Sequence, residues 1–209
     1  MDPMDFKAET LQMLENTQMG SEQARKHQRT QRLHLDKYRS WLELAQEHKH
    51  YGCFAIYGSA GSGKSTISAA LIHSELRPHA WHFCKHNDRR RADPVRMFKT
   101  LIYQLAFSIP VLQGWLLSHL ETHGAHQFVQ VDHAFNVLLK RPLEHLGDIN
   151  KVPDNGIVIL LDALDEADGK LGAFDNHILL ALREMFPRLP KFCRFVVTSR
   201  PESEYPHIL

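Results

Sequence analysis

A glycine-rich segment, GSAGSGKS, has the residue types and spacing that enclose phosphate groups. It fits the pattern G-x-x-x-x-G-K-[ST] and lies between a strand-like and a helix-like run, so backbone N–H groups at the helix start can surround phosphate oxygens. Lys64 would reach the β and γ phosphates, Ser65 would offer its hydroxyl to Mg²⁺, and Thr66 would touch the α-phosphate. A plain strand-to-helix turn would give this lysine no packing role. The predicted nucleotide-binding residues are Gly58, Ser59, Ala60, Gly61, Ser62, Gly63, Lys64, Ser65 and Thr66.

Four carboxylates crowd behind an unbroken aliphatic run in the stretch LLDALDEAD. Like charges repel one another, so a cation is expected among them. Asp162, at the end of the strand-like IVILLD, would hold Mg²⁺ directly or through water. Asp165 and Glu166 are both candidates for the catalytic group that activates the attacking water, and the sequence does not decide between them. Asp168 is expected to face solvent or Lys170.

The acidic motif, in which Asp162 is followed by the small Ala163, one further residue and paired acids, resembles that of the NACHT group of signal-transduction (STAND) P-loop NTPases. Further segments are similar as well, over about residues 51–205: GSAGSGKST, AWHFCKHND, DPVRMFKTLIYQLA, FNVLLKRPLEHL and FVVTSRPE. The likeness is strongest to NACHT domains of large repeat-containing proteins. It implies ATP or ADP with Mg²⁺ as cofactors. It also implies that Arg200, in the sensor-like TSR, lies near the γ-phosphate, where it could distinguish triphosphate from diphosphate or stabilise charge during transfer.

The function that this resemblance implies is Mg²⁺-dependent ATP binding with slow hydrolysis, used as a nucleotide-dependent switch for signalling or assembly. Protein partners or self-association are expected in a longer parent protein. Two alternatives stay open: a non-hydrolysing nucleotide-binding scaffold, and a small-molecule P-loop kinase, for which no acceptor pocket or Arg-rich lid is recognisable. Similar proteins continue beyond the sensor motif into a further strand, a helical segment and a winged helix. Because the chain stops at Leu209, binding is expected more firmly than turnover.

Positioning these groups requires alternating strands and helices. Strand-like runs at 53–57, 80–84, 157–162 and 193–199 alternate with helical patterns at 94–109, 111–121, 133–146 and 176–186. This alternation predicts an α/β fold, a three-layer P-loop NTPase with a mainly parallel sheet. Residues 1–50 are expected to form a helical N-terminal segment, weakly ordered in its first part, with a helix from about 33 to 48 docked on the core. Residues 51–209 are expected to form the NTPase core.

Composition limits the class of partner. The 209 residues are 43% hydrophobic, enough for one sizeable domain. Lys plus Arg number 25 against 24 Asp plus Glu, so the formal charge of +1 gives no basis for binding nucleic acid or an anionic membrane. The acidic start MDPMDFKAET is no secretory signal and no apolar run is long enough to span a membrane, so a cytoplasmic location is expected. Cys53, Cys84 and Cys193 are expected to be reduced thiols packed in strands.

Three further patterns could bind a ligand or a partner, but for each we prefer an ordinary structural role. The alternating histidines and cysteine of HFCKH could form a metal set, but cysteine in a strand is more often a packing residue. The basic stretch KHNDRRR could meet an acidic partner or a neighbouring subunit's nucleotide, but a solvated loop is the commoner outcome. Tyr38 and Trp41 could flank an adenine base, but we prefer packing of the preceding helix on the core.

Overall fold

The computed structural model describes residues 21–48, 52–85, 88, 90–123, 128, 130–167 and 177–201. The strands are β1 (Gly52–Tyr57), β2 (Ala80–Phe83), β3 (Ile157–Asp162) and β4 (Cys193–Ser199). The α-helices are α2 (Ser21–His48), α3 (Lys64–Ile72), α4 (Pro94–Ser108), α5 (Val111–His123), α6 (Val131–Phe135), α7 (Arg141–Asp148) and α8 (His177–Met185). A π-helical segment, η1 (Asn136–Lys140), joins α6 to α7, and two 3-10 turns are η2 (Leu164–Ala167) and η4 (Phe186–Arg188).

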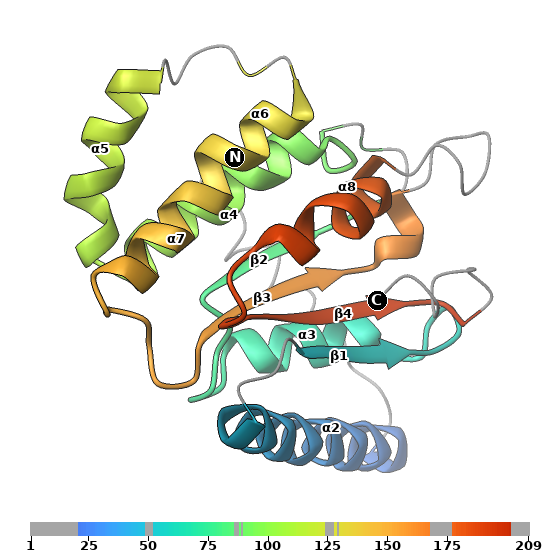
Figure 1. Cartoon of the computed structure of the whole chain (residues 1–209). Coiled ribbons are helices and arrows are strands. Elements are labelled where there is room, and N and C mark those ends of the chain that lie inside the picture. The colour runs from blue at the N-terminus through green and yellow to red at the C-terminus, as the bar shows by residue number, and fades with distance from the viewer. Residues whose placement is uncertain are drawn as a thin grey trace.

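The four strands pair in parallel in the order β1-β4-β3-β2 (Figure 1). Every residue of β3 and β4 is buried, which explains why IVILLD and most of CRFVVTS read as continuous apolar runs. The predicted α/β fold with a parallel sheet is therefore confirmed. Strand β4 lies between β1, which leads into the glycine loop, and β3, which ends at Asp162.

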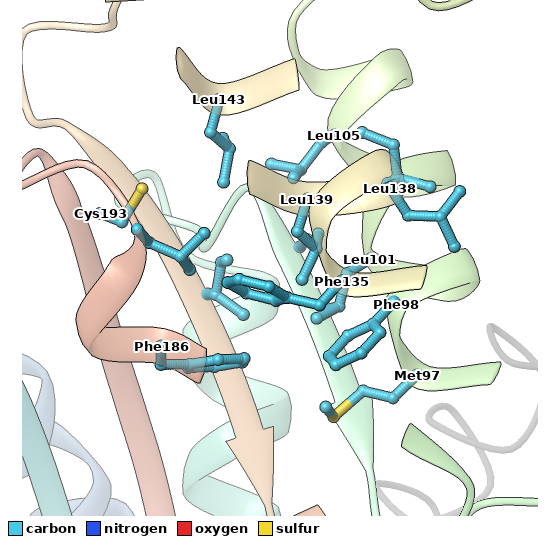
Figure 2. Packing of buried hydrophobic residues seen from close by; sticks show 14 of the residues in the cluster. Met97, Phe98, Leu101, Leu105, Phe135, Leu138, Leu139, Leu143, Phe186 and Cys193 are labelled. Carbon is cyan, nitrogen blue, oxygen red and sulfur yellow. The ribbon is translucent and has the colours of Figure 1, made fainter. Parts of the chain in front are cut away.

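Helices cover both faces of the sheet, and each face has its own apolar core. Helices α2 and α3 lie on one face, and their core with the strands includes Tyr38, Leu42, Ile67, Leu71, Val158 and Val196. Helices α4, α6, α7 and α8 cover the other face around a larger core (Figures 1 and 2) that includes Phe98, Leu101, Phe135, Leu139, Phe195 and Val197. Successive β4 residues thus point into opposite cores, as the pleat requires. The three-layer arrangement follows from this alternation.

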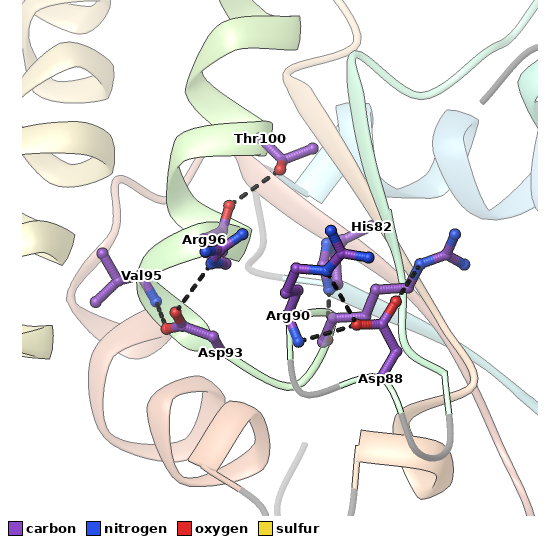
Figure 3. Close-up of polar contacts among 8 residues, drawn as sticks. His82, Asp88, Arg90, Asp93, Val95, Arg96 and Thr100 are labelled. Carbon is purple, nitrogen blue, oxygen red and sulfur yellow. Dashed lines mark hydrogen bonds and ion pairs between the residues drawn. The ribbon is translucent and has the colours of Figure 1, made fainter. Parts of the chain in front are cut away.

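Helix α4 begins and packs as its sequence predicts. The Asp93 side chain accepts a hydrogen bond of 2.9 Å from the backbone N–H of Val95, and Pro94 takes the first helical position (Figure 3). Phe98 and Leu101, on the inner face, are fully buried. The cap thus fixes where α4 begins, and the buried residues pack it on the sheet.

Helix α2 runs from Ser21 to His48, so it begins ahead of the docked helix predicted from about residue 33 and lies within the segment expected to be helical. The apolar pattern marks only the part of the helix that docks. The docked part is fixed by polar contacts as well. The Tyr38 hydroxyl donates to the Leu76 carbonyl at 3.0 Å, and the buried Arg194 of β4 donates to the Leu42 carbonyl at 3.3 Å. The predicted weak order of the first part of the chain lies outside the described residues.

The helical pattern at 133–146 is interrupted by the π-helical segment η1. Pro142 lacks an N–H group and cannot donate to the carbonyl four residues before it. The preceding residue, Arg141, donates its N–H to the Asn136 carbonyl five residues back, which is the π-helical spacing. Local widening of the turn thus absorbs the proline without breaking the helix.

Among the described residues, none of the helices has both the length and the apolar character needed to cross a bilayer.

Candidate nucleotide site

The glycine loop lies between β1 and α3, at the carboxyl edge of the sheet. Gly61 and Gly63 have φ angles of 73° and 89°, a left-handed region that glycine adopts without strain. A Cβ atom at Gly58 would collide with the Ser62 side chain. Gly63 is the N-cap of α3 and carries no side chain to cap it, so the first N–H groups of the helix have no side-chain cap. The loop therefore has the form of an anion cradle at a helix N-terminus.

Lys64 folds back over this cradle. Its ammonium group donates to the carbonyl oxygens of Gly58 at 2.5 Å and Ser59 at 3.0 Å. A phosphate oxygen, being charged, is a stronger acceptor than a carbonyl, so these bonds are of the kind that a bound phosphate can replace. Ser65 and Thr66 follow in the first turn of α3.

Asp162 is the polar centre of the site, and only 1% of its surface is exposed. Its Oδ2 accepts a hydrogen bond of 2.7 Å from the Ser65 hydroxyl. Its Oδ1 accepts two, from the Ser68 hydroxyl at 2.6 Å and the Thr198 hydroxyl at 2.8 Å. The carboxylate thus joins α3 to β4 across the sheet edge. The structure brings Ser65 and Asp162 together, as the sequence predicted.

Ser68 and Thr198 are site residues that the sequence reasoning missed. Ser68 stands one turn after Lys64 on the buried side of α3, where a polar residue among Ile67 and Ala69 is a signal in itself. Thr198 belongs to the TSR segment, for which the resemblance implies a role only for Arg200. Both side chains are fully buried, so their hydroxyls need an acceptor inside the protein.

The charge state of Asp162 reflects two opposing effects. Burial raises the pKa of its carboxyl group, and the nearby Glu166 adds to that rise, while the three hydroxyl donors lower it. Burial dominates, so the free carboxylate would gain from a cation. The Ser65 hydroxyl and the facing Asp162 oxygen are hard oxygen donors that suit Mg²⁺, which commonly takes one or two protein ligands and completes its shell with phosphate oxygens and water. Within the described ranges, no cluster of three or more His, Cys, Asp or Glu suits a metal held by protein alone.

The two candidate water-activating acids have different surroundings. Asp165 is bound by Arg200 through an Nε–Oδ2 ion pair of 2.8 Å and a backbone N–H bond to Oδ1 of 3.2 Å. Glu166 is half-buried one residue further along η2, and its N–H donates to the Ala163 carbonyl at 2.8 Å. Ala163 itself has a φ of 56° and donates its N–H to Thr198. This sharp turn directs the acids back over the sheet edge, with Asp165 engaged by the arginine predicted for the γ-phosphate.

The patterns set aside earlier have structural roles where they are described. His82 is buried and its Nε2 lies 2.9 Å from the Arg91 carbonyl oxygen, and Asp88 pairs with Arg90 and Arg91 to fold the same loop (Figure 3). Cys84 lies one residue beyond β2, and its N–H donates to the Asp162 carbonyl at 3.0 Å. The predictions for His86, Arg89, Asp168 and Lys170 concern residues outside those described.

Tyr38 and Trp41 pack against each other and against Phe54 of β1, with ring centroids 5.6 to 5.9 Å apart. Tyr38 is fully buried in this cluster. The packing interpretation is confirmed for Tyr38.

A parallel sheet flanked by helices, with a glycine loop at its carboxyl edge facing a buried aspartate, is the arrangement of a P-loop NTPase-like protein. The family model described as Nephrocystin 3, N-terminal, matches residues 29–200, and the chain belongs to that family. The family is NACHT-like and related to P-loop NTPases, although its link to NACHT itself is weak. A search of curated proteins gave no significant match.

Proposed function

We propose that the chain binds ATP with Mg²⁺ in the glycine loop and hydrolyses it slowly, and that the two nucleotide states act as a switch in signalling or assembly, as in NACHT-like STAND NTPases. ADP is the product and second ligand of the same site. The switch would act through protein partners or self-association in a longer protein. The family match supports a nucleotide-binding role in general, and the finer features rest on the site residues.

One observation carries the proposal: Ser65 and Asp162, 97 residues apart in sequence, have oxygen atoms 2.7 Å apart at the mouth of the phosphate cradle. Packing does not require a buried carboxylate here, because burial alone disfavours its charge. A divalent cation between these oxygens and a bound polyphosphate would account for both residues.

Each residue has a distinct part in this proposal. The loop N–H groups and Lys64 hold the phosphates, and Ser65 and Asp162 hold Mg²⁺, which when bound neutralises phosphate charge. Glu166 is the group that orients and deprotonates the attacking water, since Asp165 is bound to Arg200. Arg200 would pair with the γ-phosphate only by giving up part of its contact with Asp165.

That same ion pair favours the second candidate function, a scaffold that binds nucleotide without hydrolysing it. In the described structure Arg200 and Asp165 neutralise each other, so one candidate catalytic acid and the candidate γ-phosphate arginine are both engaged. A protein that keeps this pair when ATP binds would use the nucleotide for stability alone.

The first experiment measures the affinities for ATP, GTP and ADP, each with Mg²⁺ and with EDTA. Parent protein, Lys64→Ala and the matched surface control Lys151→Ala are compared. We expect Mg²⁺-enhanced binding in the parent and the control and none in Lys64→Ala. Absence of binding in the parent would refute the proposed function. Single-turnover hydrolysis by the parent, lost in Glu166→Gln, would support the switch, whereas tight binding without hydrolysis in the parent would support the scaffold.

A further inference from the structure

The Ser68 hydroxyl has an unusual partner for a serine inside a helix. Such a side chain commonly donates a hydrogen bond to a backbone carbonyl oxygen of the preceding turn, or it faces solvent. Ser68 is fully buried, and it donates across to Asp162 on β3 at 2.6 Å. Its hydroxyl therefore serves the carboxylate of a different element.

The hydrogen bonds to Asp162 are divided unequally between its two oxygens. Oδ1 accepts from Ser68 and from Thr198, and two donors satisfy both lone pairs of a carboxylate oxygen. Among the described residues, the hydrogen bond recorded at Oδ2 comes from Ser65. Oδ2 thus keeps acceptor capacity on the side that faces the phosphate cradle.

The two donors to Oδ1 come from different elements of the fold. Ser68 projects from α3, which packs on one face of the sheet, and Thr198 projects from β4, the strand next to β3. Thr198 also accepts the Ala163 N–H at 2.8 Å, so its hydroxyl proton is directed to Asp162. Rotation of the carboxylate would break both bonds to Oδ1, and with Ser68 removed that oxygen would keep the bond from Thr198 while Oδ2 keeps the one from Ser65.

We propose that Ser68 is a positioning residue that fixes the plane of the Asp162 carboxylate and thereby sets the affinity of the site for Mg²⁺. The inference rests on the proposed function, because it concerns the same site. Partners that orient a metal ligand without touching the metal typically change metal affinity by about 10- to 100-fold when removed. Ser68 is expected to fall in that range while leaving nucleotide binding without Mg²⁺ unchanged.

The test titrates Mg²⁺ into protein with a fluorescent ATP analogue and records the analogue's affinity at each Mg²⁺ concentration and in EDTA. Parent, Ser68→Ala and Ser74→Ala are compared. Ser74 is a matched control because it follows α3 and donates its hydroxyl locally to the Leu71 carbonyl at 2.8 Å. In Ser68→Ala the Mg²⁺ midpoint should rise by about 10-fold or more. The affinity in EDTA should match the parent's, and Ser74→Ala should behave as the parent throughout.

A second variant covers the case in which Ser68→Ala does not fold, as judged by circular dichroism. Ser68→Cys keeps nearly the same volume but offers a weaker donor, so its Mg²⁺ midpoint should rise by a smaller factor. An unchanged midpoint in whichever of these variants folds would overturn the inference, and so would an equal loss of affinity with and without Mg²⁺. A parent that binds no analogue at all would refute the proposed function instead, so the two failures are distinguishable.

Discussion

Replacing Asp162 by asparagine is expected to stabilise the nucleotide-free protein, whereas replacing it by alanine is expected to destabilise it. Asparagine keeps an oxygen that can accept from Ser68 and Thr198, and it removes a charge that burial disfavours. The gain is about 1.4 kcal/mol for each unit by which the pKa of Asp162 is raised. Alanine leaves the Ser68 and Thr198 hydroxyls buried without this acceptor, at about 1–3 kcal/mol each.

The size of the effect in a thermal assay follows from the chain length. For a protein of about 200 residues, 1 kcal/mol shifts the Tm by roughly 2–4 °C. In EDTA, Asp162→Asn should therefore melt above the parent, and Asp162→Ala, which leaves two hydroxyls without this acceptor, roughly 4–24 °C below it. With saturating Mg²⁺ and ATP, the parent should instead melt above Asp162→Asn. A ligand stabilises only the protein that binds it, by about 2.7 kcal/mol at 100 times Kd.

The pH dependence gives this prediction a second check. The folded-state pKa of Asp162 is raised, so the parent's deficit relative to Asp162→Asn is complete above that raised pKa and is lost as the pH falls from there to the unfolded-state value of 3.8. The difference in Tm should therefore shrink as the pH is lowered through this range. If Asp162→Asn were as destabilising as Asp162→Ala in EDTA, burial of the charged Asp162 carboxylate would not destabilise the nucleotide-free protein, and the prediction would be wrong.

Three further predictions concern other parts of the fold. Gly63→Ala places a side chain at φ 89° and should lower the free energy of unfolding by about 1–2 kcal/mol in urea titrations and abolish nucleotide binding; normal stability would contradict the strain at this position. Burial lowers the pKa of His82, so stability should be complete above the unfolded-state pKa of 6.5 and should fall below it until the folded-state pKa is passed. His82→Gln should flatten this dependence of Tm on pH and the exposed-site control His73→Gln should not; equal slopes in all three proteins would exclude His82 as the cause. Burial raises the pKa of the Cys53 thiol to about 12, so iodoacetamide at pH 8 should label it only after denaturation, and rapid labelling of the native protein would disprove its protection.

The local features of the site were predictable from sequence because they are continuous in it. The glycine loop is one string, and its flanking patterns of period two and 3.6 identify the strand and the helix. Asp162 was likewise predictable as the end of a strand buried on both faces. The α/β class followed from the alternation of such segments.

The hydrogen bonds and the ion pair between different elements of the site were not predictable from the sequence, because they depend on which strands are neighbours. Thr198 reaches Asp162 only because β4 lies beside β3, and Ser68 only because α3 packs over that edge. The pairing of Asp165 with Arg200 depends on the same strand order combined with the tight turn at Ala163. Residue types and spacing within one segment carry no information about such contacts between segments.

The docking of α2 determines where the chain can be shortened. A protein starting at residue 51 would lose Tyr38 and Leu42, which belong to the same apolar core as Leu71 and Val196, and would lose the carbonyl that Arg194 contacts. The uncovered face would combine apolar surface with a buried cation that has lost an acceptor, a combination that favours aggregation. Failure of such a fragment to bind nucleotide would reflect lost solubility and not the chemistry of the loop. Expression boundaries for the assays above should therefore keep the whole of α2, and fusion tags should be joined ahead of it.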